Sequence, residues 1–284
     1  MFKIKALRQE DIPFAIRLSN QEKWGISRRD FERVLTLSPR GCFLAYDGYR
    51  KLGLATTTSY GREAAWIGNV VVDRTYRGKH IGTSLVEHAV SHLQKSGVKR
   101  IVLYCFNENV EFYGNLGFVK DARFARLRRK RKPAPLRNSD PRSLRTPTVD
   151  RILSADRKAF GADRSKLIRL LLRKRIGWYV GAEHGKASLS YLFVKQYEDM
   201  CEFGPWVCIK PQKGDSGEIL DTALGKAARQ PVEIACLLNH RNELALLRKN
   251  GFRITNRGYR MCFRKRHTIG DDRSQYALGF LDKG

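Results

Sequence analysis

The chain has 284 residues, of which 55 are Lys or Arg and 28 are Asp or Glu, so its formal net charge is +27. This length allows two ordinary domains with a core each, and no apolar run approaches the roughly 20 residues of a membrane-spanning helix. The positive charge attracts anions such as coenzyme phosphates, nucleic acids or acidic membranes without selecting among them. A general adaptation for solubility would give the same composition.

The six cysteines lie far apart, without a CxxC pair and without histidines at metal-ligand spacing. Several stand in apolar runs, which favours buried, reduced thiols over disulfides or a zinc site. The N-terminus alternates apolar and charged residues as a first strand does, and shows no signal peptide. We therefore expect a cytoplasmic protein without a metal centre.

The first 120 residues predict a strand, two helices, and then a series of strands and helices. Residues 11–19 are amphipathic, and Ser27 and Asp30 can cap a second helix. The later elements are three strands, a helix, a strand and a helix, expected over residues 41–46, 52–58, 66–72, 82–95, 100–105 and 107–116. This order predicts an α/β fold in which a mixed, partly parallel sheet is flanked by helices.

The clearest break in the chain lies between about residues 120 and 148. A run of Arg and Lys at 126–132 leads into a Pro-rich stretch, where proline keeps the chain extended. The basic run is typical of a solvated edge strand, although it would also suit a phosphate backbone such as that of RNA. We assign a first domain, a Pro-rich basic linker, a second domain and a C-terminal tail to residues 1–132, 133–147, 148–266 and 267–284.

Similar short segments recur at a nearly constant distance along the chain. The offset is 134 or 136 residues, and the pairs are Gly41–Ala45 with Gly177–Gly181, Ile67-Gly68 with Phe203-Gly204, Trp24-Gly25 with Phe160-Gly161, and Leu116–Phe118 with Asn250–Phe252. Four pairs with almost the same offset indicate a tandem duplication of one fold.

One segment between a strand and a helix carries the signs of an anion site, namely Arg77-Gly78-Lys79-His80-Ile81-Gly82-Thr83. A strand that turns into a helix N-terminus presents unpaired N–H groups, and these groups and the helix dipole favour a pyrophosphate. Glycines let phosphate oxygens approach the backbone, while Arg77 and Lys79 add charge. Neither a P-loop nor a dinucleotide-binding GxGxxG opens a helix here.

Two motifs in the first domain resemble those of the GNAT superfamily of acetyl-CoA-dependent N-acetyltransferases. The family's cradle, R/Q-x-x-G-x-G/A after a strand, corresponds to Arg77-x-x-His80-x-Gly82, with His80 in place of the usual glycine. The second motif is an Asn followed by a helix that ends in Tyr-x-x-x-Gly-Phe. It corresponds to Asn107 and to Tyr113 through Phe118.

The resemblance implies acetyl-CoA as co-substrate and a set of residues that would hold it. The coenzyme-binding residues are Val70, Val72, Arg77, Gly78, Lys79, His80, Gly82, Thr83 and Asn107. The backbones of Val70 and Val72 would pair with the pantetheine arm, which Asn107 would also contact. His80 can donate its amide from an ordinary helical conformation, whereas a left-handed backbone at this position would strain His80 or disable the site.

The resemblance also implies that the Tyr113 phenol protonates the leaving thiolate as a general acid. The alternative for Tyr113 is a core aromatic whose hydroxyl caps a strand. The acceptor amine must lose a proton as well, usually to a carboxylate or to ordered water. Glu22, Glu63 and Asp73 fall in plausible regions, and the sequence does not single out one of them.

The second domain keeps the order of elements but not the chemistry. In it Gln212, Asp215 and Leu247 stand where the first domain has Arg77, His80 and Tyr113. A carboxylate repels pyrophosphate, and leucine has no proton to donate. The segments at 159–165 and 203–207 resemble the C-terminal domain of YitH-like tandem GNAT proteins, so we expect a degenerate transferase domain.

The expected function is acetyl transfer from acetyl-CoA to a primary amine, carried by a small molecule, a peptide or an aminoacyl-tRNA, at one site in the first domain. The alternatives are a module that binds nucleic acid such as RNA, or a ligand sensor, that retains the transferase fold. No membrane partner is expected, and the sequence leaves the oligomeric state open.

Overall fold

The computed structural model describes residues 1–130, 147–173, 177–185, 187–227, 230–267 and 269–284. Most of the predicted linker therefore lies outside the described residues. Among the described residues, no helix is both long enough and apolar enough to cross a membrane. The cytoplasmic location remains a prediction.

The two halves of the chain contain the same series of elements. The first half contains β1 (Lys3–Ala6), α1 (Ile12–Gln21), α2 (Arg28–Leu37), β2 (Cys42–Asp47), β3 (Arg50–Tyr60), β4 (Ala64–Val72), α3 (Ile81–Lys95), β5 (Ile101–Phe106), α4 (Val110–Asn115) and β6 (Phe118–Arg129). The second half contains α5 (Val149–Phe160), α6 (Ser165–Arg173), β7 (Gly177–His184), β8 (Ser188–Gln196), β9 (Cys201–Ile209), α7 (Asp215–Lys226), β10 (Val232–Leu237), α8 (Arg241–Lys249), β11 (Arg253–Phe263) and β12 (Gln275–Ala277). From α1 to β6 each element has its counterpart from α5 to β11, which confirms the duplication.

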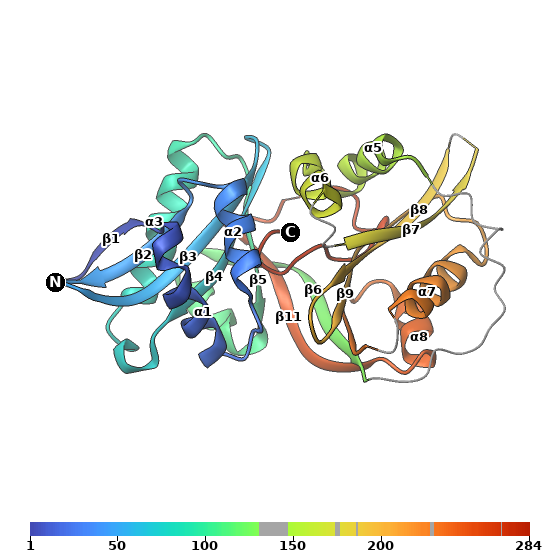
Figure 1. The fold of residues 1–284 in the computed structure, drawn as a ribbon. Coiled ribbons are helices and arrows are strands. Elements are labelled where there is room, and N and C mark those ends of the chain that lie inside the picture. The colour runs from blue at the N-terminus through green and yellow to red at the C-terminus, as the bar shows by residue number, and fades with distance from the viewer. Residues whose placement is uncertain (131–146, 174–176, 186, 228–229, 268) are drawn as a thin grey trace.

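The described strands form one continuous sheet of 12 strands that passes through both halves (Figure 1). The order is β1-β2-β3-β4-β5-β11-β6-β10-β12-β9-β8-β7. Most neighbouring strands are antiparallel, whereas β4 pairs with β5 and β9 pairs with β10 in parallel. The predicted mixed, partly parallel sheet with flanking helices is confirmed.

The last strands of the two halves are exchanged, and Figure 1 shows β6 and β11 side by side in the middle of the molecule. β11 pairs with β5 of the first half, and β6 pairs with β10 of the second half. At Gly258 of β11 a Cβ would lie 2.0 Å from the Cys105 carbonyl oxygen, so this strand pairing requires glycine. The domain ranges 1–132 and 148–266 remain predictions. They describe the order of the two halves along the chain only, because each half completes its sheet with a strand of the other half.

The basic run before the linker does not lie on an edge strand, as its composition had suggested. β6 is a central strand between β11 and β10. The side chains of Arg126 and Arg128 lie 4.0 Å and 3.8 Å from the Glu233 carboxylate on β10. A carboxylate on the neighbouring strand therefore offsets part of the positive charge of the run.

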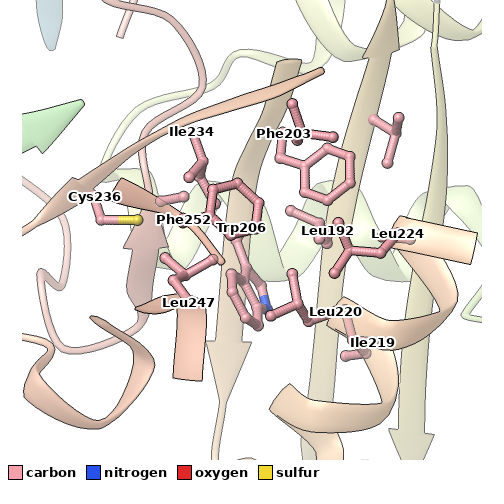
Figure 2. Packing of buried hydrophobic residues seen from close by; sticks show 14 of the residues in the cluster. Leu192, Phe203, Trp206, Ile219, Leu220, Leu224, Ile234, Cys236, Leu247 and Phe252 are labelled. Atoms are coloured by element: carbon pink, nitrogen blue, oxygen red, sulfur yellow. The ribbon is translucent and has the colours of Figure 1, made fainter. Parts of the chain in front are cut away.

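The hydrophobic cores follow the strand exchange. The core beneath α7 and α8 surrounds Trp206 and includes Leu127 from β6 (Figure 2), while the core beneath α3 includes Met261 from β11. A third core joins the halves, where Trp66 of β4 stacks on Phe160 of α5 with ring centroids 4.8 Å apart. Because apolar surface is buried across the halves, they are held together by the same effect that stabilises each core.

The end of the chain is not the free tail that the sequence suggested. Strand β12 is part of the sheet, and the chain end lies in the centre of the molecule (Figure 1). Residues 278–284, which we name the C-terminal segment, bury the side chains of Leu278, Phe280 and Lys283. Two large apolar side chains give this short segment a face to bury, which stabilises its contact with the sheet.

All six cysteines are buried and unpaired, as predicted; they are Cys42, Cys105, Cys201, Cys208, Cys236 and Cys262. Across the described ranges, no group of three or more His, Cys, Asp or Glu side chains is arranged to hold a metal ion.

Candidate active site

β4 and β5 are paired only where they begin. Their parallel register ends at Trp66 and Val102, whereas β4 stays paired with β3 as far as Val72. The edge of β4 that contains Val70 and Val72 is therefore not paired with β5. An extended ligand can add its own hydrogen bonds to such a free strand edge.

A bulge at Gly68 and Asn69 bends β4 at the start of this free edge. The register with β3 shifts there, and Asn69 adopts a left-handed conformation with φ 50°. The Asn69 side-chain amide donates to Thr56 Oγ1 at 3.0 Å, and that hydroxyl donates to the Gly68 carbonyl at 3.1 Å. Bulges redirect strand groups and are common beside active sites. The sequence contains a signal for this bulge, a Gly-Asn pair inside an apolar strand, which the prediction of a regular strand did not take into account.

The N-terminus of α3 is open to an anion. Its first helical hydrogen bond runs from the Ser84 amide to the His80 carbonyl at 3.0 Å. In the described chain no acceptor is recorded for the backbone amides of residues 78–83, and no side chain caps α3. These amides include those of Gly82 and Thr83 in the first turn. Unpaired donors at a helix N-terminus form an anion site.

His80 corrects our expectation about the backbone here. We expected an ordinary helical conformation, but His80 is the N-cap residue of α3 with φ 55° and ψ 13°, in the left-handed region. Gly78 is also left-handed, with φ 76°. A left-handed conformation costs most residues about 1–2 kcal/mol, and glycine nothing. This cost explains why a glycine is usual at the position of His80, where the turn directs several amides to one point.

The Arg77 side chain is held by partners within the protein. It donates to the Glu22 carboxylate at 2.5 Å and to the Val72 carbonyl at 3.1 Å. Arg74 contacts the same carboxylate at 3.3 Å, so Glu22 orders the arginines of the cradle rather than facing the free edge of β4. Lys79 stays exposed, with Nζ 5.6 Å from the centre of the Tyr76 ring.

The other two candidate bases are also engaged away from the bulge. The Asp73 carboxylate accepts from the Thr75 amide and from Arg17, each at 3.2 Å. Although burial opposes the effect, these bonds lower the pKa of Asp73. Glu63 is exposed, and its hydrogen bond from Lys99 lowers its pKa. A carboxylate with a lowered pKa is a weak proton acceptor, and the base stays unassigned among the three.

Tyr113 lies half-buried on α4, with its ring edge-on to Phe112 and Phe118 at centroid distances of 5.0 Å and 6.0 Å. Burial, with a smaller effect of Cys105, raises the pKa of Tyr113 above its usual value. The phenol therefore stays protonated, as a proton donor must be, but is a weaker acid than expected. A Cβ at Gly82 would lie 3.5 Å from the Phe112 ring, so α4 and the cradle lie side by side.

Asn107 completes the set of predicted residues. It follows β5 directly, begins a short 3-10 turn, Asn107–Asn109, and is exposed. Because β4 and β5 are parallel, this end of β5 and the residues Val70 and Val72 lie at the same end of the two strands. The structure thus brings the free edge of β4, the open helix N-terminus and α4 together.

In the second half, the corresponding position is occupied by the protein itself. β9 and β10 also diverge after a short parallel pairing, but β12 lies between them, paired with Val207 and Trp206 on β9 and with Cys236 on β10. Leu247, the counterpart of Tyr113, is buried in the core beneath α8 (Figure 2). The second half has neither a free strand edge nor a proton donor at these places.

The N-terminus of α7 corrects one alignment. Its N-cap residue is Gly214, with φ 105°, so Gly214 rather than Asp215 matches His80. Asp215 is the first residue of α7, and its carboxylate accepts from the Gln212 amide at 2.9 Å and contacts His184 Nε2 at 2.9 Å. A buried carboxylate therefore already takes the place where an anion would bind, and a phosphate there would be repelled.

Comparisons with known proteins agree with this architecture. A family model described as the acetyltransferase (GNAT) family matches residues 5–118, and one described as an acetyltransferase (GNAT) domain matches residues 152–277. The chain belongs to the GNAT acetyltransferase family. It is a tandem GNAT chain with one family domain in each half.

Individual relatives support the fold rather than a substrate. A histone acetyltransferase, TAP1 from Glycine max, is 38% identical over 72 residues, which cover 25% of this chain and 31% of TAP1. This chain thus spans about a third of the length of that relative. The structure of this chain is similar to that of a proposed acetyltransferase from Pyrococcus horikoshii, with a TM-score of 0.80 and 20% identity. The match covers 100% of this chain and 96% of the other. A tandem GNAT protein from the clavulanic acid biosynthesis pathway matches with TM-score 0.66, 15% identity, and coverage of 92% and 98%.

Proposed function

We propose that this GNAT chain transfers an acetyl group from acetyl-CoA to a primary amine, at one site formed by β4, α3 and α4. The observation that carries the proposal is the divergence of β4 from β5 directly beside the open N-terminus of α3. An extended arm with a pyrophosphate at one end fits this combination of a free strand edge and unpaired helix amides.

In this site, the backbone of Val70 and the amide of Val72 would hold the pantetheine arm, since the Val72 carbonyl accepts from Arg77, and Asn107 would contact the arm from the end of β5. The amides of residues 78–83 would hold the pyrophosphate, with charge from Lys79. The amine gives up a proton to a carboxylate or to water, its nitrogen bonds to the acetyl carbon as the carbon–sulfur bond breaks, and Tyr113 would donate its own proton to the thiolate that leaves. The raised pKa of Tyr113 keeps this proton in place before the reaction.

Two observations favour the first half as the only active one. β12 already pairs with the strand edge of β9 that a pantetheine arm would need, and the Asp215 carboxylate, which accepts from the Gln212 amide, places a negative charge at the start of α7. The proposal therefore predicts one acetyl-CoA for each chain. The name of TAP1 refers to histones, which is in keeping with an amine acceptor, although the identity of the acceptor is a separate question.

A calorimetric titration with acetyl-CoA tests the site, and release of free thiol tests turnover with three amines: spermidine, glucosamine and a peptide with a free N-terminus. Tyr113→Phe should lower turnover about 100-fold, the lower range for loss of a general acid, with acetyl-CoA affinity unchanged. Tyr49→Phe, at an exposed tyrosine in the turn after β2, is the matched control.

The outcomes separate the alternatives. Unchanged turnover in Tyr113→Phe would show that the general-acid role is wrong. Two molecules of acetyl-CoA for each chain would show that the second half also binds. If the protein binds no acetyl-CoA but binds RNA with a steep salt dependence, the nucleic-acid module is the better description.

A further inference from the structure

The C-terminal segment lies directly against the bulge of β4. A Cβ on Gly68 would come within 2.6 Å of the Cα, Cβ and carbonyl oxygen of Asp282. The Asn69 side-chain amide donates to Asp282 Oδ2 at 3.0 Å. Further on, a Cβ on Gly284 would lie 2.7 Å from the Trp66 ring. The segment therefore runs along β4 from the bulge to Trp66, where the pairing of β4 with β5 ends.

Buried contacts from both halves fix the segment in this position. The Tyr60 hydroxyl donates to the Lys283 carbonyl at 2.6 Å, and Arg164 donates to the Gly284 carbonyl at 3.0 Å. The buried Lys195 ammonium donates to the Gly279 carbonyl. Since the buried Tyr60 hydroxyl would lose its acceptor, and Arg164 and Lys195 would keep only their carboxylate partners Asp156 and Glu202, displacement of the segment is costly. The segment is a fixed part of the site wall.

The bulge is also where the reacting end of acetyl-CoA would lie, if the proposed function holds. The cradle follows the C-terminal end of β4, so a coenzyme held there by its pyrophosphate runs back along β4 from Val72 toward Gly68. These four steps along the strand span about 13 Å. Pairing of β4 with β5 at Trp66 ends the free edge beyond this point. The thioester would therefore lie beside Gly68 and Asn69, the two residues that Asp282 contacts.

Asp282 presents a charged carboxylate at this place. Its side chain is 21% exposed, whereas that of Lys283, its ion-pair partner, is only 3% exposed. Although burial opposes the effect, Lys283 and then Asn69 lower the pKa of Asp282, so the carboxylate is ionised at neutral pH. The three candidate bases of the first half, Glu22, Glu63 and Asp73, are instead engaged by Arg77, Lys99 and Arg17. Lys283 and Asn69 both contact Oδ2, so it is the part of the carboxylate that stays exposed beside the thioester that can pair with an ammonium group.

We propose that Asp282 binds the acceptor, by pairing its carboxylate with the ammonium group of the primary amine and so placing the nitrogen beside the thioester. This inference rests on the proposed function and adds a residue from outside both of the predicted domains. The lowered pKa makes Asp282 an anchor for the amine rather than the group that removes its proton, which passes to water before the nitrogen attacks the acetyl carbon. The second half then has a function without a coenzyme, because its buried side chains hold the segment that carries Asp282.

The test is Asp282→Asn, which keeps the shape of the side chain and an oxygen to accept from Asn69. The KM for the amines spermidine, glucosamine and the peptide should rise at least about tenfold, equivalent to about 1.4 kcal/mol of lost binding. The kcat and the acetyl-CoA affinity should stay within about twofold of the wild-type values, and the pH profile of kcat should be unchanged. Asp282→Glu should recover part of the KM, and Asp47→Asn, at the exposed end of β2, should change nothing.

Several results would overturn the role of Asp282. One is an unchanged KM in Asp282→Asn. A second is a lower kcat with a shifted pH profile, which would make Asp282 the base. A third is a wild-type protein that binds acetyl-CoA but shows no saturable interaction with any of the three amines. Failure of the wild type to bind acetyl-CoA would instead refute the proposed function itself, so the two failures are distinguishable.

Discussion

Asp156 of α5 and Arg164 form an ion pair buried between the two halves. Both side chains are 2% exposed, and the guanidinium donates to the two carboxylate oxygens at 2.8 Å and 2.9 Å. The Tyr191 hydroxyl donates to the same carboxylate. Arg164 also lies over the Phe160 ring at 4.0 Å. The pair therefore connects α5, β8 and the C-terminal segment.

Asp156→Ala should be strongly destabilising, because it leaves the guanidinium buried without a counter-charge. Removal of one partner of a buried ion pair costs about 3–5 kcal/mol. The Tyr191 hydroxyl loses its acceptor as well, a cost of about 1–3 kcal/mol that overlaps with the first. With about 2–4 °C for each kcal/mol in a protein of this size, the midpoint of thermal unfolding should fall by roughly 10 °C.

The same helix supplies a matched control. Asp150, also on α5, pairs with Arg169 of α6 at 3.1 Å, but the Asp150 side chain is 86% exposed. Asp150→Ala should therefore change stability by less than about 1 kcal/mol. Urea unfolding of both variants measures the difference. A cost below about 1 kcal/mol for Asp156→Ala, or equal costs for the two variants, would refute the argument that burial decides the value of these pairs.

Two further predictions concern pH and the cradle. Burial, only partly offset by Glu202, lowers the pKa of Lys195 from 10.5 to about 8. The unfolded chain therefore binds more protons than the folded chain between pH 8 and 10.5. The stability of the wild type relative to Lys195→Met should increase as the pH rises through this range. Urea unfolding at several pH values measures this, and a difference that does not vary with pH would contradict it. Gly82→Ala should raise the free energy of unfolding by about 0.5–1 kcal/mol, because the new Cβ makes only ordinary contacts at 3.5 Å and 3.7 Å. The same substitution should weaken acetyl-CoA binding on the order of tenfold, because the methyl group keeps phosphate away from the backbone. Gly217→Ala in the first turn of α7, where a Cβ meets nothing within 4 Å, should change stability alone, and equal coenzyme affinities in the two variants would argue against the cradle.

Local signals in the sequence were enough to predict most elements of each half. The helix expected over 82–95 is α3, Ile81–Lys95, and the predicted cap at Ser27 is present, with its amide donating to the Asp30 carboxylate at 3.0 Å. Both signals depend only on neighbours in the chain, namely the spacing of apolar residues and the chemistry of a helix start. The duplication was visible for the same reason, because repeated segments can be compared without knowing where they lie in space.

Backbone conformation at single residues was less predictable. His80 proved to be left-handed, and Asp215 proved to lie one position beyond the counterpart of His80. In both cases the turn before the helix decides the conformation, and a turn can be entered with one residue more or less. The bulge at Asn69 depends likewise on its hydrogen bond to Thr56 from the neighbouring strand.

The sequence by itself determined the family, the two copies and the position of the open helix N-terminus. Only the tertiary structure decided how the copies combine. β6 and β11 are duplicates with similar patterns, so nothing local states which of them pairs with β5; packing across the whole sheet settles that choice. The same holds for the last ten residues, whose place between β9 and β10 and against Gly68 is fixed by contacts with residues more than 40 positions away. Side chains that meet only after folding therefore complete the candidate site.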